Sequence, residues 1–503
     1  MKIQFDNSYA RLPEDFYSKT NPTPVKSPEL IKFNTELAKE LGLTGVNPDS
    51  LEALNVFSGN DIAEGSEPIS MAYAGHQFGG FSPRLGDGRA VLLGEIVAPN
   101  NTRYDFQLKG SGHTPWSRGG DGRSALGPVL REYLVSEAMA KLGVPTTRAL
   151  AAVTTGEEVA RNTLVPGGIL TRIAKGFVRV GTFQYFSSQG NQEAIKRLAD
   201  YEIDRHYPDA KNTDNPYIAF FKLVVDAQAK LIAKWMSLGF IHGVMNTDNM
   251  SIAGETIDYG PCAFMDEFSH SRVYSSIDHQ ARYAYGNQPK IGQWNLVRLA
   301  ETLLPLFIGK EIDETREATD EEAQAVVKIA EDILSNYSEL YHQYWLENMR
   351  KKLGLSESHE GDAELINDLL NIMESSQADF TLTFYYLSQV DQLKQARALF
   401  SKTETLSDKS FDEWIIKWQE RLKKESSNEE QYSAMMQTVN PVYIPRNHQI
   451  EAAIRAAEDN NDFSVFHDLH EVLENPFELQ TGKEAYMLPP EPEEVVHQTF
   501  CGT

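Results

Sequence analysis

The chain has 503 residues, of which 41% are hydrophobic and 24% charged, a composition that supports a packed core and excludes wholesale disorder. Its 47 Lys and Arg residues against 72 Asp and Glu residues give a formal net charge of −25. This balance argues against a general nucleic-acid-binding protein, which needs an extended basic face, but it allows one local basic pocket for phosphates.

The cysteine content and the first residues indicate a cytoplasmic protein. Two cysteines, Cys262 and Cys501, are too few for a disulfide-stabilised secreted scaffold. No apolar run approaches the roughly 18–20 residues that cross a bilayer, and the N-terminal sequence resembles neither a signal peptide nor a transit peptide. We therefore expect a cytoplasmic protein with neither a membrane nor nucleic acid among its partners.

The N-terminal part of the chain predicts a β-rich region. Residues 1–75 mix short helical stretches with Pro, Asn and Ser, and we interpret them as an N-terminal extension that wraps around a larger body. Residues 76–185 are interpreted as a small β-rich lobe with one helix. The elements predicted there are strands over residues 89–97, 104–109 and 169–174 and a helix over residues 127–142.

The rest of the chain predicts mostly helices. The clearest is an amphipathic helix over residues 217–238, followed by an irregular polar stretch. Residues 186–345 are interpreted as a large helical lobe that carries a catalytic loop. Residues 346–503 are interpreted as a helical C-terminal extension with a loop near residues 356–362 and a Pro- and Glu-rich tail. The order of elements predicts an α+β, two-lobed fold.

Glycine-rich stretches in the small lobe are candidate phosphate-binding loops. Gly86, Gly88 and Arg89 precede a predicted strand, where glycines let backbone N–H groups approach phosphate oxygens and an arginine adds charge. Residues 112–123 form a second polar, glycine-rich loop between a strand and a helix. Taken alone, the first stretch is more typical of a tight turn, and the second is equally compatible with a mobile surface loop.

Lys109 and Glu132 form a candidate ion pair of the kind that holds nucleotide phosphates in kinases. In a strand, Lys109 lies on the opposite face from Phe106 and Leu108. Glu132 on the following helix is the candidate partner, and Glu137, about one helical turn further on, is its competitor. The alternative is that these charges are simply solvated.

The segment after the amphipathic helix carries the most informative polar residues. Asn249 and Asp258 are predicted to lie at the two ends of a short hairpin, where an amide oxygen and a carboxylate would suit Mg²⁺. Asp248 lies beside this pair and is the candidate base. Standing alone, the segment would be interpreted as an Asx-rich turn. The order of the preceding elements favours a catalytic loop instead.

This segment can be compared with the kinase catalytic loop, H-R-D-x-x-x-x-N. If His242 takes the first position, Asn249 falls on the metal-binding Asn, and residues 258–260 stand where the D-F-G motif belongs. The position of the catalytic Asp is then Val244, which cannot accept a proton. The chain therefore predicts kinase-like metal ligands without the kinase base, and hence either an inert nucleotide-binding protein or different chemistry with ATP.

Taken together, the motifs resemble the selenoprotein O family, protein adenylyltransferases on a pseudokinase fold. The resemblance covers nearly the whole chain. It rests on residues 73–79, 85–89, 107–110, 121–123, 131–134, 145–150, 242–249, 440–441 and 444–448.

The resemblance implies transfer of AMP from ATP to Ser, Thr or Tyr hydroxyls of proteins, with release of pyrophosphate and with the nucleotide inverted relative to kinases. UMP transfer with Mn²⁺ is linked to some bacterial members, so the nucleotide and the choice of Mg²⁺ or Mn²⁺ stay open. The resemblance implies that Asn249 and Asp258 bind the metal, that Glu132 orients Lys109, and that Asp248 accepts the proton. The residues that it implies contact ATP are Gly86, Gly88, Arg89, Lys109, Asp121, Gly122, Arg172, Arg179 and Asp258.

Two other functions stay open: a protein kinase with Asp248 as its base, and an inert ATP-binding scaffold. Cys501 stands where many family members carry selenocysteine or cysteine, whereas Cys262 matches no family cysteine. A redox-sensitive disulfide between Cys501 and Cys262 is a hypothesis that requires the tail to fold back over the cleft. The alternative is a buried, inert Cys262 and a mobile tail.

Overall fold

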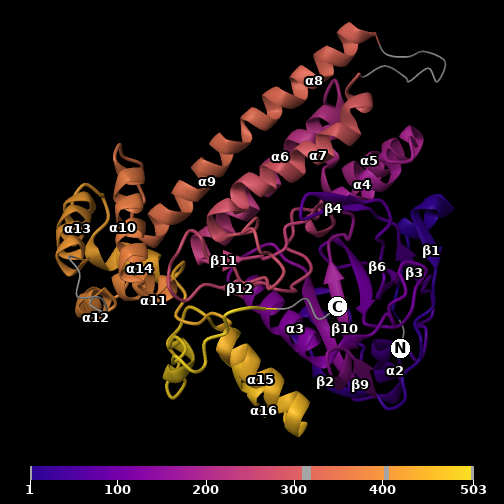
Figure 1. Cartoon of the computed structure of the whole chain (residues 1–503), viewed down its shortest axis with the longest axis horizontal. Coiled ribbons are helices and arrows are strands. Elements are labelled where there is room, and N and C mark those ends of the chain that lie inside the picture. Colours follow the sequence, from indigo (N-terminus) through magenta and orange to yellow (C-terminus); the bar gives the residue numbers. More distant parts are fainter. Residues whose placement is uncertain (1–2, 309–318, 401–406, 500–503) are drawn as a thin grey trace.

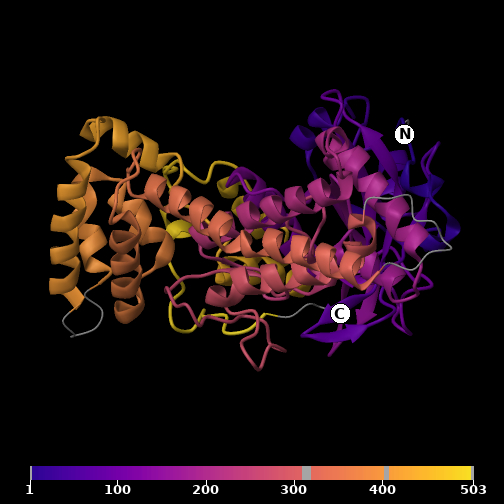
Figure 2. The same ribbon diagram turned by 90° about the horizontal axis from the view of Figure 1, so that it is seen from above.

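The computed structural model describes residues 3–308, 319–400 and 407–499. It is a mixed structure of an antiparallel sheet and many helices, as the predicted α+β class requires. The sheet and the N-terminal helices lie at one end of the molecule, and α10 to α14 lie at the other (Figures 1 and 2). No helix of the described ranges is both long and apolar enough to cross a membrane. The predicted domain boundaries stay predictions.

The strands form one large sheet and two small ones. They are β1 (Tyr17–Lys19), β2 (Glu29–Phe33), β3 (Ile69–Met71), β4 (Gly75–Gln77), β5 (Gly80–Ser82), β6 (Ala90–Val97), β7 (Arg103–Lys109), β8 (Ser124–Ala125), β9 (Arg148–Ala160), β10 (Leu164–Ala174), β11 (Phe240–Ile241) and β12 (Ala263–Phe264). The large sheet has the order β1-β3-β6-β7-β10-β9-β2, with β8 paired to β10. The hairpin β4–β5 and the pair β11–β12 stand apart from it.

Three helices, α1 to α3, lie between strands of the large sheet along the chain, and the other helices of the described residues follow β10. The helices are α1 (Thr35–Glu40), α2 (Leu51–Ser58), α3 (Leu126–Lys141), α4 (Val180–Ser187), α5 (Gln192–His206), α6 (Pro216–Leu238), α7 (Gln288–Phe307), α8 (Asp320–Ser335), α9 (Tyr337–Lys352), α10 (Asp362–Ser376), α11 (Phe380–Leu387), α12 (Leu393–Ala398), α13 (Ser407–Leu422), α14 (Glu429–Gln437), α15 (Asn447–Asn460) and α16 (Ser464–Leu473).

The strands predicted at residues 89–97 and 104–109 are confirmed as β6 and β7, which pair directly. Phe106 and Leu108 are fully buried in an apolar cluster with residues of α1 and α2. Lys109 lies on the opposite face, as the alternation of side chains along a strand predicts. The sheet therefore directs one face toward a core and offers its other face to a polar site.

The first 75 residues contribute more to the sheet than short helical stretches predict. β2 pairs with β9 at one edge, whereas β1 and β3 extend the other edge beyond β6. The helices α1 and α2 of this region help to bury the apolar face of the sheet. This N-terminal region is thus part of the scaffold that supports the polar face.

Helix α3 is buried on all sides, although its sequence suggests one apolar stripe and one solvated face. Besides Leu130 and Leu134, the charged residues Arg131, Glu132 and Glu137 are buried. The reason is that α3 packs against β9 and β10 on one side and against α15 and α16 on the other. Charges that the sequence leaves free to be solvated must therefore find partners inside the protein.

Helix α6 confirms the amphipathic helix predicted at residues 217–238. It begins after Asn215, whose side chain accepts from the N–H groups of Tyr217 and Ile218, and it ends at Gly239 in the left-handed conformation. The irregular segment that follows returns toward the sheet, which brings the polar residues of the predicted catalytic loop to its open face.

Arg446 ties the C-terminal region to the segment that follows the polar loop. It is fully buried, lies 2.8 Å from Asp379 and also contacts Asp266, and it donates to the carbonyl oxygen of Met487. Asp379 in turn caps α11 through the N–H of Leu382 at 2.8 Å. One guanidinium therefore joins three distant parts of the chain.

Replacing Arg446 with Met should lower the free energy of unfolding by about 3–5 kcal/mol, because two carboxylates lose their buried cation. Lys417→Met on α13 is a control, since the ion pair of Lys417 with Asp368 is exposed on both sides and such pairs contribute at most about 1 kcal/mol. Urea denaturation measures both losses, and partial recovery on adding Asp379→Asn to Arg446→Met is expected. Similar losses for Arg446→Met and Lys417→Met would contradict a central role for Arg446.

Candidate functional site

A cavity of about 650 Å³ opens between the polar face of the sheet and the loop that follows α6. The structure brings every residue predicted for the site to this one cavity, although what they bind stays a prediction. The predicted residues in its lining are Gly86, Gly88, Arg89, Lys109, Asp121, Gly122, Glu132, Arg172, Arg179, Asp248, Asn249 and Asp258.

The predicted pair of Lys109 and Glu132 is present. The Lys109 Nζ atom lies 2.5 Å from Glu132 Oε2 and 3.5 Å from Asp258 Oδ1. The competitor Glu137 has other partners: it is bound by Arg148 at 2.8 Å and by the side chain of Asn34 at 2.7 Å. Because both carboxylates on α3 are paired inside the protein, neither is a solvated surface charge.

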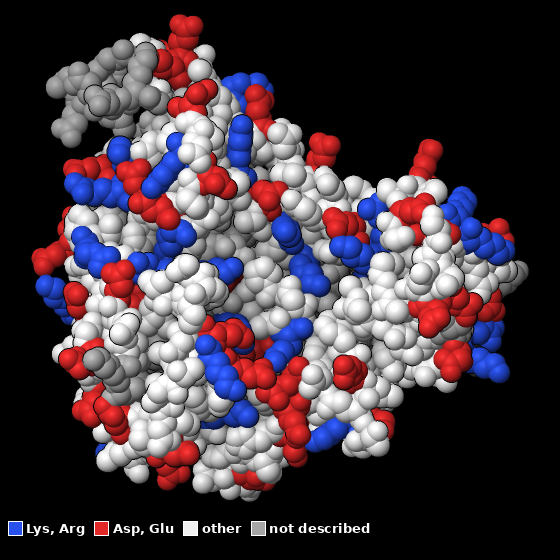
Figure 3. Space-filling model, turned by 180° about the vertical axis from the view of Figure 1, so that it is seen from behind, with Lys and Arg blue, Asp and Glu red and all other residues white. Residues whose placement is uncertain are grey.

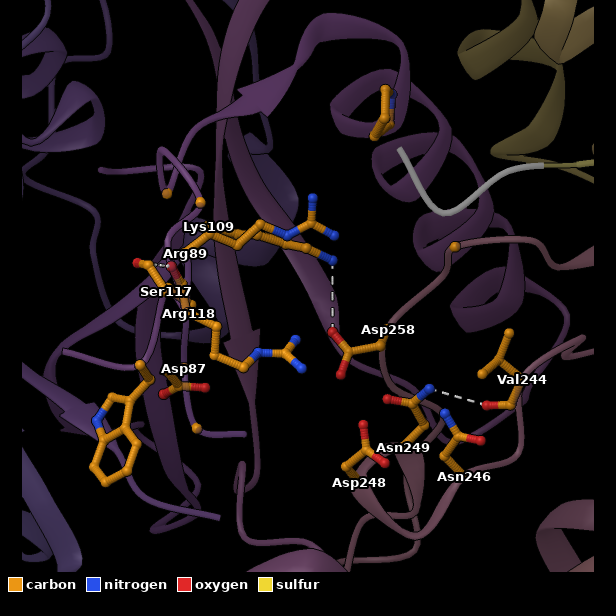
Figure 4. A pocket seen from close by; sticks show the side chains of 18 of the residues that line it. Asp87, Arg89, Lys109, Ser117, Arg118, Val244, Asn246, Asp248, Asn249 and Asp258 are labelled. Atoms are coloured by element: carbon orange, nitrogen blue, oxygen red, sulfur yellow. Dashed lines mark hydrogen bonds and ion pairs between the residues drawn. The ribbon is translucent and has the colours of Figure 1, made fainter. Parts of the chain in front are cut away.

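Asp258 gathers three cations in the cavity. Figure 4 shows its contact with Lys109. Arg172 on β10 lies 2.7 Å from its Oδ1 atom, and Arg179, at the N-terminus of α4, lies 3.0 Å from its Oδ2 atom. Burial alone would raise the pKa of Asp258, but the charges of Arg172, Lys109 and Arg179 hold that pKa well below its ordinary value. Asp258 is therefore ionised at neutral pH.

The two arginines are fixed by aromatic rings as well as by Asp258. The guanidinium of Arg172 lies 4.9 Å from the centre of the Phe177 ring, and that of Arg179 lies 4.4 Å from the centre of the Tyr73 ring. Arg179 also donates to the backbone oxygen of Asp248 at 2.8 Å. Both side chains are buried and point inward, so their positions are set before any ligand arrives.

Asp248 is a buried carboxylate with one unused oxygen. Its Oδ2 atom accepts from the side chain of Gln77 at 3.1 Å, whereas Oδ1 has no hydrogen-bond partner among the described residues. Burial raises the pKa of Asp248 to about 6. Gly75 makes room for it, because a Cβ atom at Gly75 would lie only 2.6 Å from Asp248 Oδ1. The loop therefore presents a proton acceptor that is stronger than an ordinary carboxylate.

Asn249 and Asp258 point toward one another, as Figure 4 shows. The amide nitrogen of Asn249 donates to the backbone oxygen of Val244 at 2.9 Å, which leaves its oxygen for the cavity. One amide oxygen and one carboxylate fit a hard cation such as Mg²⁺ or Mn²⁺, which takes its other ligands from water and phosphates. Within the described ranges no cluster of three or more His, Cys, Asp or Glu side chains is positioned to hold a metal.

The hairpin predicted between Asn249 and Asp258 is wrong. Ser251 instead forms an isolated antiparallel bridge with Arg179, and Thr256 forms a parallel bridge with Thr146. The two halves of the segment thus pair with parts of the chain far away in sequence. These long-range contacts hold Asp258 in the left-handed conformation, with a φ of +59°, where a residue other than glycine is strained.

The glycines near Arg89 are required by packing within the protein. A Cβ atom at Gly86 would lie 2.3 Å from the Trp116 ring, and one at Gly88 would lie 2.9 Å from the Trp116 backbone oxygen. This geometry favours the tight-turn interpretation over glycines that directly admit a ligand. Asp121 is half exposed and forms an ion pair with Arg161 at 2.9 Å, so it belongs to the rim of the cavity.

Several further residues of the cavity escaped the sequence-based prediction. Asp87, between the two glycines, is buried with a pKa raised to about 6 and accepts from the backbone of Met71. Asn246, Phe78 and Arg118 also line the cavity. Asp87 lies in the Gly-Asp-Gly motif, and Asn246 lies in the Asn-Thr-Asp-Asn motif. The spacing within these motifs does not distinguish residues that line a cavity from residues that only form a turn.

The described tail folds back over the segment that follows Asp258. Thr499 bridges Ser275, and its hydroxyl donates to the backbone oxygen of Pro261 at 2.7 Å. Cys262 is fully buried. Cys501 lies outside the described residues, so the hypothesis of a disulfide between the two cysteines stays open.

Comparisons with known proteins identify the family of the whole chain. The family model described as protein adenylyltransferase SelO matches residues 1–474. The chain belongs to this family. It is 54% identical over 499 residues to the protein nucleotidyltransferase YdiU of Rhizobium etli strain CFN 42, covering 99% of this chain and 97% of the relative. It is 52% identical over 503 residues to YdiU of Agrobacterium fabrum strain C58, covering 100% of both chains.

The packing of Gly86 can be tested against Gly143. The two glycines have nearly the same φ, +71° and +73°, but a Cβ atom at Gly143 would meet no described atom within 4 Å. Gly143→Ala should destabilise the SelO-family chain by about 1 kcal/mol through backbone strain alone. Gly86→Ala should cost about 1–3 kcal/mol more, because the methyl group must displace Trp116. Thermal unfolding measures the difference, and equal losses would contradict the packing role of Gly86.

Proposed function

We propose that the chain is a protein adenylyltransferase that transfers AMP from ATP to Ser, Thr or Tyr hydroxyls of other proteins and releases pyrophosphate. The fold that we propose for it is kinase-like, with a small β-rich lobe and a large helical lobe around the cavity. The observation that carries this proposal is a single cavity that holds three cations around Asp258 and a separate buried carboxylate, Asp248. Family membership supports the reaction type.

The cations are suited to stabilise a transferring phosphate. Attack at the α-phosphorus builds negative charge on its non-bridging oxygens and on the departing pyrophosphate. Lys109, Arg172 and Arg179 are buried and held in place by carboxylates and rings, so little reorganisation is needed when this charge develops. We expect Arg172 and Arg179, which are less exposed than Lys109, to face the phosphates that leave.

Asp248 is suited to accept the proton of the attacking hydroxyl. Its Oδ1 atom has no partner among the described residues, and its pKa of about 6 lets it be ionised at neutral pH while still accepting a proton readily. Val244, at the position of the kinase base, has no group that could do so. The reaction balances when the hydroxyl oxygen bonds to the α-phosphorus, its proton goes to Asp248, and pyrophosphate leaves.

Asn249 and Asp258 would hold the divalent cation that the family reaction implies, Mg²⁺ or Mn²⁺. When bound, such a cation neutralises phosphate charge and polarises phosphate oxygens. Gly86, Gly88, Arg89, Asp121 and Gly122 would surround the rest of the nucleotide. Which nucleotide is preferred, ATP or UTP, is left to the assay, because the cavity lining favours phosphates without selecting a base.

The position of a radioactive label distinguishes the possible activities. With ATP labelled at the α-phosphate, we expect label on acceptor proteins, and with ATP labelled at the γ-phosphate we expect none. Label from the γ-phosphate would indicate a kinase, and no label from either would indicate an inert ATP-binding scaffold. Asp258→Ala should abolish the α-label because it removes the carboxylate that organises the cations and the metal. The control is Asp368→Ala on α10, which removes one partner of a half-exposed ion pair and should leave the amount of α-label unchanged.

Asp248→Asn should slow transfer by roughly 10²–10⁴, the usual contribution of a positioned acid–base group. The amide keeps the shape and can still accept from Gln77, so nucleotide affinity should change little. Calorimetric titration with ATP and the rate of α-label transfer separate these effects. Loss of nucleotide binding together with turnover would instead make Asp248 a metal ligand.

A further inference from the structure

The glycine-rich loop at the rim of the cavity contains a turn with an unusual residue. The N–H of Gly120 donates to the backbone oxygen of Ser117 at 2.8 Å, which closes a four-residue turn. Its two central residues, Arg118 and Gly119, have φ angles of +51° and +84°. Positive φ at both positions defines a type I′ turn, which strongly prefers Asn or Gly at the first of them. An arginine there is strained, and such strain is characteristic of residues that contact a ligand.

The turn that carries Arg118 is fixed to the sheet side of the cavity. The Ser117 hydroxyl donates to the backbone oxygen of Gly88 at 2.5 Å and accepts from the N–H of Thr114 at 2.9 Å. Thr114 in turn donates to the backbone oxygen of Asp87 at 2.7 Å. The base of the turn is therefore held firmly, so its direction is set by the fold.

The side chain of Arg118 projects from this turn into the middle of the cavity, toward the carboxylate of Asp258 (Figure 4). Two other arginines of the cavity lining already have partners. Arg161, between β9 and β10, pairs with Asp121 at 2.9 Å, and Arg123 of the loop donates to the backbone oxygen of Thr23 at 2.9 Å. Arg118 itself forms no ion pair with any carboxylate in the part of the chain that the structure describes.

The balance of positive and negative charges in the cavity indicates a role for Arg118. The three buried cations Lys109, Arg172 and Arg179 are bound by two carboxylates, Asp258 and Glu132, which leaves one positive charge. Asp87 and Asp248 add further carboxylates to the same lining. On the face drawn in Figure 3, acidic and basic side chains are likewise interspersed. The buried residues alone thus leave little excess positive charge for a triphosphate.

We propose that Arg118 is a phosphate-binding residue that engages the β- and γ-phosphates of the nucleotide from the glycine-rich loop at the rim of the cavity. This inference rests on the proposed function, since it takes a nucleoside triphosphate as the ligand. Arg118 supplies the unpaired charge that the buried cations lack, and its guanidinium can bind phosphate oxygens through two parallel N–H groups. The strained turn keeps it directed inward before the nucleotide arrives.

Binding measurements on turn variants test this proposal. The probes are α,β-methylene-ATP, which cannot transfer its α-phosphate, and AMP, which lacks the outer phosphates, each with Mg²⁺ in a calorimetric titration. Arg118→Gly and Arg118→Asn both suit the left-handed backbone and remove the charge. We expect each to weaken binding of the ATP analogue about tenfold while changing AMP affinity less than about twofold. Arg118→Lys should recover part of the loss.

The matched control is Arg84→Ala, because Arg84 is exposed and stacks on Trp116 from outside the cavity lining. It removes the same charge nearby and should change affinity for either probe less than about twofold. The unfolding midpoint of nucleotide-free Arg118→Gly should not fall, since glycine relieves the strain. Unchanged binding of the ATP analogue, or equal losses for both probes, would overturn the proposal.

The outcome is separable from that of the proposed function. Wild-type protein that binds the ATP analogue through Arg118 but transfers no α-label would refute the transferase and keep the phosphate-binding role. Wild-type protein that transfers the α-label, while its Arg118 variants bind normally, would refute the role of Arg118 alone.

Discussion

The site depends on the carboxylate of Asp258, which binds Lys109, Arg172 and Arg179 at once. These cations come from β7, from β10 and from the start of α4, so one anion fixes how three elements meet. Without it, three buried like charges would repel one another, and Arg172 and Arg179 would lose their shortest carboxylate contacts. The strained left-handed backbone of Asp258 is tolerated because these ion pairs and the bridges on both sides of it outweigh the strain.

The same balance explains why the cavity can be both strongly charged and stable when empty. Asp258 and Glu132 bind the three buried cations, and Asp87 and Asp248 add two carboxylates to the cavity lining. The rings of Phe177 and Tyr73 cover two of the cations. A ligand with phosphates therefore enters a site whose charges are already paired and immobile. Additional positive charge must come from groups at the rim or from a metal, because burying a further unpaired cation in the interior would cost a large free energy of desolvation.

The sequence alone predicted the strands β6 and β7, the helices α3 and α6, and the residues that meet in the cavity, because these depend on local periodicity and on recognisable motifs. The predictions failed where contacts between residues distant in the sequence determine the local structure. The strand β9 has no β-branched residue among its first five residues, 148–152, and is held by its neighbours β10 and β2. The expected hairpin before Asp258 is replaced by pairing with Arg179 and Thr146, which no spacing within the segment could indicate.

The position of the candidate base follows the same rule. Asp248 can lie in the cavity only because Gly75, in the separate hairpin β4–β5, has no side chain where its Oδ1 atom lies, and because Gly181 at the start of α4 approaches its backbone. Gln77 of the same hairpin then fixes its other oxygen. Moving a base from the position of Val244 to that of Asp248 therefore requires matching residues in two other elements. An Asp restored at Val244 alone would lack this support, so the chemistry of the loop is set by the elements packed against it.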